Sequence, residues 1–197
     1  MIRLVHVITG LGTGGAEMML YKLLSSTRRD EFAHTVISLT DLEALKPRIE
    51  ALGVPVMSLG MARGLPSPLD LWRLVRILRR HAPALVQTWM YHGDLLGGLA
   101  ARLAGVPVLW GVRQSTFDPR RSRRRTMWVA RACARLSRWV PAAIVCCSEE
   151  GRRVHQALGY AAQKMRVIPN GFDLASFAPD PQARAAVRRE LGLPPDA

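Results

Sequence analysis

Short, mostly apolar runs alternate with amphipathic segments along most of this chain. Runs such as Ile2 to Ile8 predict buried strands, because a parallel sheet is covered on both faces. Between these runs, apolar residues recur every three or four positions, as they do on one face of a helix. The predicted strands are 2–8, 35–39, 54–59, 84–88, 106–112, 142–147 and 165–168. The predicted helices are 16–27, 42–52, 68–80, 93–104, 123–139, 149–158 and 183–191.

This alternation predicts an α/β fold with a Rossmann-like, doubly wound parallel sheet and right-handed crossovers. Ligands of such sheets bind beyond the carboxyl ends of the strands. We therefore expect the segments that follow the strands to gather along one edge of the sheet. They are Thr9 to Gly15, Trp89 to His92, Arg113 to Thr116, Ser148 to Glu149 and Pro169 to Gly171.

A glycine-rich loop follows the first predicted strand and leads into a helix. Gly10, Gly12 and Gly15 fit the spacing G-x-G-x-x-G. A dinucleotide site needs an acidic residue at the end of the second strand, but Asp41 comes late and Asp30 precedes that strand. Glycines before a helix N-terminus suit an anion, because the first N–H groups of the helix are unpaired. A phosphate or substrate loop and a purely structural tight turn both remain open.

Composition limits the classes of protein to consider. The 197 residues suffice for one well-cored domain, and their formal net charge is +13. Of the 28 basic residues 25 are arginine, a skew typical of GC-rich codon usage, so only the clustering of charge is informative. Three cysteines suit neither a disulfide framework nor a zinc site and favour a reducing cytoplasm. Without a secretory pattern or an apolar run long enough for a membrane span, we expect a soluble or peripheral protein.

The pattern changes after Ile168. Turn residues, a proline-containing linker and one short helix follow, without another strand. We expect residues 1–170 to form one domain. Residues 171–197 then form an interdomain linker and a helix that lead to a second domain absent from this chain.

Five motifs in order resemble the N-terminal half of glycosyltransferase family 4, whose members have the two-domain GT-B fold. They are Gly10 to Glu17, Gln87 to Gly97, Ala100 to Pro107, Cys147 to Glu149 and Ile168 to Asp173. The resemblance implies a retaining, metal-independent transfer of a sugar from a nucleotide-sugar donor to a glycan or lipid-linked acceptor. It implies no cofactor and no metal site. The donor-binding domain would lie beyond this chain, so the fragment alone should be inactive. A non-catalytic module that binds a nucleotide or phosphate is the main alternative.

The resemblance also suggests roles for individual residues. Donor diphosphate binding falls to Gly12, Gly14 and Gly15, catalysis to His92, acceptor binding to Tyr91, Arg113 and Ser115, and interdomain contact to Asn170 and Gly171. An imidazole such as that of His92 can polarise a hydroxyl, although a structural histidine at a helix N-terminus fits the sequence equally well. Many relatives carry a histidine near Arg113. Because arginine cannot act as a base, we expect Arg113 to bind a phosphate.

The predicted helix at 123–139 is strongly basic. Its arginines and those just before it alternate with apolar residues that include Trp128 and Trp139. Such a helix can lie on an anionic membrane surface, which would suit a lipid-linked acceptor and a peripheral location at the cytoplasmic face. A sheet-covering helix with a solvated arginine face is the competing interpretation. No recognised nucleic-acid-binding motif is present, so we expect no nucleic-acid partner.

Overall fold

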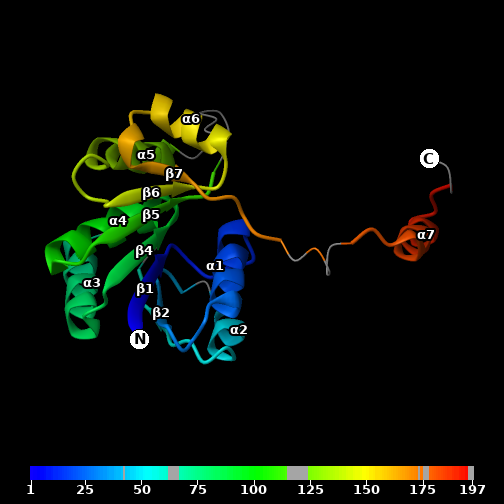
Figure 1. The fold of residues 1–197 in the computed structure, drawn as a ribbon, viewed down its shortest axis with the longest axis horizontal. Coiled ribbons are helices and arrows are strands. Elements are labelled where there is room, and N and C mark those ends of the chain that lie inside the picture. Colours follow the sequence, from blue (N-terminus) through cyan, green and yellow to red (C-terminus); the bar gives the residue numbers. More distant parts are fainter. Residues whose placement is uncertain (42, 62–66, 115–123, 173, 175–177, 195–197) are drawn as a thin grey trace.

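The computed structural model describes residues 1–41, 43–61, 67–114, 124–172, 174 and 178–194. Within them, seven strands form one parallel sheet in the order β3-β2-β1-β4-β5-β6-β7 (Figure 1). The strands are β1 Ile2–Ile8, β2 Phe32–Ser38, β3 Val56–Ser58, β4 Leu85–Trp89, β5 Val108–Val112, β6 Ala143–Cys146 and β7 Met165–Val167. The doubly wound Rossmann-like sheet predicted from the sequence is thereby confirmed.

Helices connect the strands. They are α1 Gly15–Ser26, α2 Lys46–Glu50, α3 Pro68–His81, α4 Met90–Ala104, α5 Arg124–Leu136, α6 Glu149–Ala157 and α7 Pro181–Glu190, with a 3₁₀ turn at Ala162–Lys164. Two predicted helix starts are confirmed. Ser67 and Asp70 form a reciprocal capping box around Pro68, and the Ser148 hydroxyl accepts a bond from the Gly151 N–H at 3.0 Å.

The sheet is covered on both faces (Figure 1). Helices α1 and α2 lie on one face, where Ile8, Leu20 and Val36 belong to one buried cluster. Helices α3, α4 and α5 cover the other, larger cluster, which includes Leu78 and Trp110. This arrangement follows from the right-handed crossovers, because the connections run outward in opposite directions from β1 and β4.

Helix α4 approaches the sheet very closely. A Cβ atom added to Gly97 would lie 2.8 Å from Thr88 Cγ2, and one added to Gly98 would lie 2.5 Å from Trp110 Nε1. Both distances are too short for a side chain. The two glycines therefore fix α4 against β4 and β5, and with it the residues at its N-terminal end.

Several predicted boundaries were wrong. Helix α4 begins at Met90 rather than at residue 93, because Met90 adopts a left-handed backbone with φ of 65° and turns the chain directly from strand to helix. Helix α2 is confined to Lys46–Glu50, because the chain forms turns at residues 44–45 before it and 51–53 after it. Strand β2 begins at Phe32, three residues early, because its register with β1 continues to Ile2.

The C-terminal helix α7 lies apart from the sheet (Figure 1). Asp180 caps it by accepting a bond from the Gln182 N–H at 2.8 Å. The helix exposes Val187. The division of the chain at residue 170 stays a prediction.

Candidate functional site

The carboxyl ends of the parallel strands form one edge of the sheet. Because every strand pair is parallel, the segments that follow β1, β4, β5, β6 and β7 emerge at this edge. They carry the glycine loop, His92, Arg113, Ser148 and Asn170. The sequence-based expectation that these segments share an edge is met, and the following contacts define the site.

The glycine loop presents open backbone at the start of α1. A Cβ atom added to Gly12 or Gly15 would meet nothing within 4 Å among the described residues. Neither residue has a positive φ. The fold therefore does not require glycine there, whether for packing or for backbone conformation. A molecule that approaches the backbone from outside would explain both residues.

The N-terminus of α1 has no side-chain cap. Gly14 is the N-cap residue, and it cannot accept bonds from the first N–H groups of the helix through a side chain. These groups and the positive end of the helix dipole face the edge of the sheet. The Glu17 carboxylate approaches Gly14, because an added Cβ there would lie 2.5 Å from Glu17 Oε2. An incoming anion would have to displace this flexible side chain.

His92 lies in the first turn of α4, two residues after the left-handed Met90. A positive φ on a residue with a side chain costs on the order of 1 kcal/mol or more, and such strain clusters at functional sites. Burial lowers the pKa of His92 below its ordinary value, so the ring is neutral near pH 7. A neutral imidazole has one nitrogen that can accept a proton.

Tyr91 faces the core rather than the edge of the sheet. Its side chain is 4% exposed, and its hydroxyl lies 2.6 Å from His155 Nε2 on α6. His155 Nδ1 lies 2.7 Å from the Gly151 carbonyl, to which it must donate, so Nε2 accepts from Tyr91. This geometry argues against direct contact between the Tyr91 ring and an acceptor, and we assign Tyr91 a positioning role instead.

The Arg113 side chain is held at this edge by a stacking contact and a hydrogen bond. Its guanidinium stacks on the Trp89 ring, 4.4 Å from the ring centre, and Nη1 donates to Asn170 Oδ1 at 3.1 Å. Nε is buried and has no hydrogen-bond partner among the described residues. Burial lowers the pKa of Arg113, an effect that an anion seated beside it would reverse. Trp89 at the end of β4, Arg113 just after β5 and Asn170 after β7 thus form one unit.

Two buried histidines hold the Trp89 ring in place. Its indole N–H donates to His6 Nδ1 at 3.4 Å, and His6 Nε2 lies 2.9 Å from His34 Nδ1. His6 is fully buried, and this burial, with a smaller contribution from His34, lowers the pKa of His6 to about 3. Burial also lowers the pKa of His34. Both histidines are therefore neutral parts of the sheet. They hold the Trp89 ring in place, and the Arg113 guanidinium lies on that ring.

Asp94 was not among the site residues predicted from the sequence, and it lies beneath the site. Its side chain is fully buried, and Oδ1 lies 2.5 Å from Thr88 Oγ1 and 3.3 Å from the Gly111 nitrogen. Burial raises the pKa of Asp94 to about 7. Asp94 connects α4 to the ends of β4 and β5. An acidic residue within an apolar, glycine-rich helical stretch was the available sequence signal.

For two other predicted site residues, Ser115 and Gly171, the described part of the structure shows no contact that would indicate a role. Ser115 lies outside the described residues. Gly171 is exposed, and a Cβ atom added there would meet nothing within 4 Å among the described residues. A hydrogen bond joins Arg113 to Asn170, whereas among the described residues neither side chain forms a hydrogen bond or ion pair with Gly12, Gly14 or His92.

The basic helix is confirmed in part as α5, since the arginines at 120, 121 and 123 lie outside the described residues. Trp128 is 70% exposed and Trp139, just beyond the helix, is 69% exposed. A pocket of about 650 Å³ lies between α5 and α6, and its lining includes Arg131, Arg135 and Arg138. The apolar side of α5, with Val129 and Cys133, packs into the core.

No described helix combines the length and apolarity that crossing a membrane requires. No group of three or more His, Cys, Asp or Glu side chains in the described part of the chain is arranged to hold a metal ion.

Comparisons with known proteins give a consistent result. The model of a family described as Glycosyltransferase Family 4 matches residues 13–176. EpsF of Bacillus subtilis strain 168, named as a glycosyltransferase, is 28% identical over 203 residues, which cover 98% of this chain and 51% of EpsF.

Solved structures share the fold. Crystal structures of Anabaena HepE with UDP and with UDP-glucose match with a TM-score of 0.77 at 20% identity, over 97% and 98% of this chain and 50% of HepE. A glycosyltransferase from Rickettsia africae matches with a TM-score of 0.70 at 13% identity, over 100% of this chain and 51% of that protein. The chain thus spans about half the length of the relatives it matches.

Proposed function

The chain belongs to glycosyltransferase family 4, and from this we propose that it forms the acceptor-side half of a retaining enzyme. The enzyme would transfer a sugar from a nucleotide-sugar donor to a glycan or lipid-linked acceptor, without a metal ion. Residues 1–170 would form the acceptor-side domain, and residues 171–197 would lead to a donor-binding domain. The UDP and UDP-glucose complexes of HepE make a uridine diphosphate sugar the first donor to test.

The observation that carries the proposal is the edge formed by α1, α4 and Arg113. The uncapped start of α1, with open backbone at Gly12 and Gly15, offers N–H groups to a diphosphate. Charge develops on that diphosphate as the sugar leaves, so fixed donors beside it lower the barrier. Arg113, stacked and bonded in place, adds a fixed positive charge for a phosphate of donor or acceptor.

His92 is the proposed residue that polarises the acceptor hydroxyl. Its neutral ring can accept a hydrogen bond from a hydroxyl at pH 7, and the strained Met90 fixes its position at the start of α4. Asn170 would hold Arg113 and so couple the segment leading toward the donor domain to the acceptor side.

The test uses a longer protein that contains this chain, with UDP-glucose as donor. His92→Ala should lower kcat by roughly two orders of magnitude, a typical contribution of acid–base groups, while donor KM changes little. His81→Ala, a matched substitution in the last turn of α3 and outside the proposed machinery, should leave both constants unchanged. A His92→Ala enzyme with normal kcat would remove His92 from the mechanism. Donor binding without transfer to any acceptor would favour a non-catalytic nucleotide-binding module instead.

We also propose that α5 contacts an anionic membrane when the acceptor is lipid-linked. Support comes from the two exposed tryptophans at 128 and 139 beside the arginines of α5, a combination that suits the boundary between headgroups and acyl chains. This contact would place the protein peripherally at the cytoplasmic face.

A further inference from the structure

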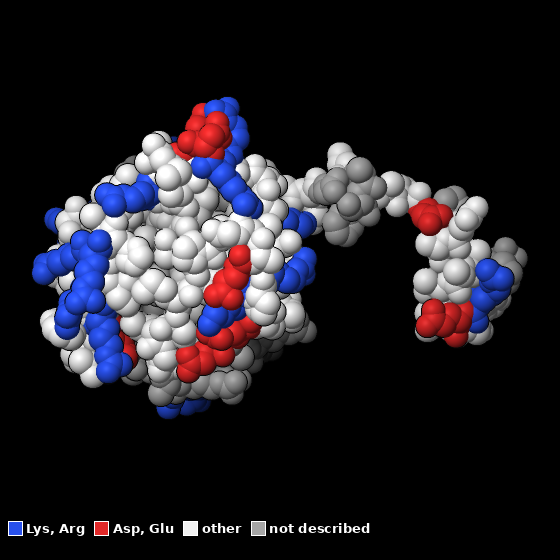
Figure 2. Space-filling view, turned by 90° about the horizontal axis from the view of Figure 1, so that it is seen from below, with Lys and Arg blue, Asp and Glu red and all other residues white. Residues whose placement is uncertain are grey.

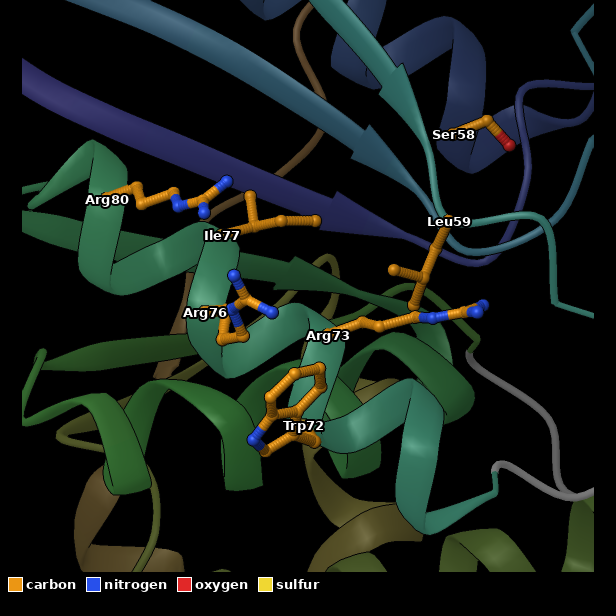
Figure 3. Close-up of a pocket in the computed structure, with 7 residues that line it drawn as sticks. All are labelled: Ser58, Leu59, Trp72, Arg73, Arg76, Ile77 and Arg80. Carbon is orange, nitrogen blue, oxygen red and sulfur yellow. The ribbon is translucent and has the colours of Figure 1, made fainter.

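A basic pocket lies at the side of the molecule, formed by α3 and the end of β3 (Figure 3). Its volume is about 310 Å³, at the lower limit of small-molecule sites. The lining consists of Ser58, Leu59, Trp72, Arg73, Arg76, Ile77 and Arg80. None of these residues belongs to the site proposed above.

The three arginines come from one face of α3. Positions 73, 76 and 80 are three and four residues apart, so their side chains lie above one another and span roughly 10 Å at 1.5 Å per residue. Figure 3 shows Arg73 directed toward Leu59, with Trp72 and Arg76 beside each other. Lys and Arg side chains also gather on the left of Figure 2, the side on which α3 lies in Figure 1. The pocket therefore presents a row of positive charges.

These charges are poorly compensated by the protein. Among the described residues, no ion pair or hydrogen bond is recorded for the guanidinium of Arg73, Arg76 or Arg80. Hydrogen bonds from Ser67 lower the pKa of the Asp70 carboxylate, and the charge of Arg73 lowers it further. The Arg76 guanidinium stacks on the Trp72 ring, 4.5 Å from the ring centre. The nearby Asp41 is not a lining residue, and its carboxylate accepts a hydrogen bond from the Ser58 hydroxyl. By contrast, Arg79 on the same helix turns to the Leu103 carbonyl of α4 at 3.0 Å.

We propose that this pocket binds a carboxylated or phosphorylated residue of an acidic glycan, a proposal that rests on the proposed function for the choice of a glycan. Guanidinium groups bind carboxylate and phosphate through paired hydrogen bonds, and the recess is large enough for about one sugar-sized group. A growing acceptor held here would be anchored beside the edge strand β3, two strands from the glycine loop after β1.

Other polyanions fit the geometry less well. Helix α3 exposes two large apolar side chains, Leu69 and Trp72, and Arg76 stacks on the Trp72 ring. Less apolar surface is therefore open to a membrane here than at the two tryptophans beside α5. Single-stranded nucleic acid uses several aromatic rings on which successive bases stack, and the pocket lining offers one. A glycan with spaced charges requires neither.

The test measures binding of a hexamer of galacturonic acid to this chain by calorimetry, with a neutral glucose hexamer of the same length for comparison. The triple variant Arg73→Gln, Arg76→Gln, Arg80→Gln should lose at least about tenfold in affinity, or about 1.4 kcal/mol. The control triple Arg153→Gln, Arg184→Gln, Arg189→Gln removes the same charge from α6 and α7 and should lose less than about twofold, because charges beyond a Debye length are screened. Trp72→Ala should also weaken binding, because it removes the ring on which the Arg76 guanidinium is held.

Three results would overturn the proposal. They are equal binding of the acidic and neutral hexamers, equal losses in the two triple variants, and binding of anionic vesicles or of an oligothymidine through these arginines without binding of the acidic hexamer. Sugar transfer is measured separately on the longer protein. An inactive enzyme that still binds the acidic hexamer through α3 would overturn the proposed function and leave the pocket standing, whereas an active enzyme without this binding would do the reverse.

Discussion

Substitutions at Gly15 can distinguish a role of the glycine loop in folding from a role in binding. Open space surrounds the position of its missing side chain, so Gly15→Val should fold, with a melting temperature close to that of the parent. In a longer protein that contains this chain, we expect Gly15→Val to lower kcat/KM by about two orders of magnitude, because the branched side chain keeps phosphate away from the backbone donors.

Gly15→Ala is the graded control, since one methyl group obstructs less and should give an intermediate loss. Steady-state kinetics with UDP-glucose and thermal melting monitored by circular dichroism measure the two effects. A fully active Gly15→Val enzyme would exclude the loop from donor binding, and an unfolded variant would show that the loop is structural.

Asp94 should make stability depend on pH. The Thr88 hydroxyl has one proton but two acceptors in reach, Asp94 Oδ1 at 2.5 Å and the Leu109 carbonyl at 3.2 Å. A protonated Asp94 resolves this conflict, because its carboxyl can donate to Thr88, which then donates to Leu109. Its pKa of about 7 in the folded chain agrees with this arrangement.

The sign of the effect follows from the raised pKa. Between pH 4 and 7 the folded chain holds a proton on Asp94 that the unfolded chain has lost, so the contribution of Asp94 to stability should fall as pH rises, by at most about 1.4 kcal/mol per pH unit. Buried histidines such as His6 and His92, whose pKa values are lowered, contribute with the opposite sign. Asp94→Asn cannot ionise and keeps the same histidines, so the free energy of unfolding of this variant minus that of the parent should increase as pH rises over that range. Urea denaturation of both proteins from pH 5 to 8 provides the comparison, and parallel curves would show that Asp94 does not titrate there.

At the scale of elements, hydrophobic periodicity was sufficient for the order of strands and helices. Strand β1 has the predicted bounds, and the capping signal at Ser67 placed the start of α3 correctly. Boundaries failed where tertiary structure overrode local pattern. Met90 takes a left-handed conformation that apolar spacing does not encode, and the earlier start of α4 turns Tyr91 into the core.

Long-range contacts were the other limit of prediction. The sequence offered Arg113 and Asn170 as separate candidates, because 57 positions divide them and only the sheet order brings β5 and β7 to the same edge. Their bond and the Trp89 stacking could not be derived from spacing. Asp94 was missed for a similar reason, since its partners lie on two strands.

Helix α5 yields a prediction for the membrane proposal. Replacing Arg124, Arg125 and Arg131 by Gln should weaken sedimentation with phosphatidylserine vesicles, since each charge near the surface contributes on the order of 1 kcal/mol. Trp128→Ser should weaken it further by removing an exposed indole from the interface.

The control is again the triple variant at positions 153, 184 and 189, which should sediment almost as the parent does. High salt should reduce binding of the parent, because screening weakens the attraction. If the parent chain does not sediment with the vesicles, or if all variants sediment equally, α5 is an ordinary sheet-covering helix with a solvated arginine face.

For the whole molecule, the proposed chemistry is divided between two domains, and this chain spans about half of its relatives. Charge on the leaving diphosphate must be stabilised from both sides of a closed cleft. The chain of 197 residues should therefore transfer no sugar and bind UDP-glucose at most weakly, because the glycine loop supplies only a few backbone donors. Calorimetry on this chain and transfer assays on a longer protein that contains it make the comparison. Micromolar binding of UDP-glucose by this chain would locate the donor site within residues 1–197, and turnover by this chain alone would refute the division of labour.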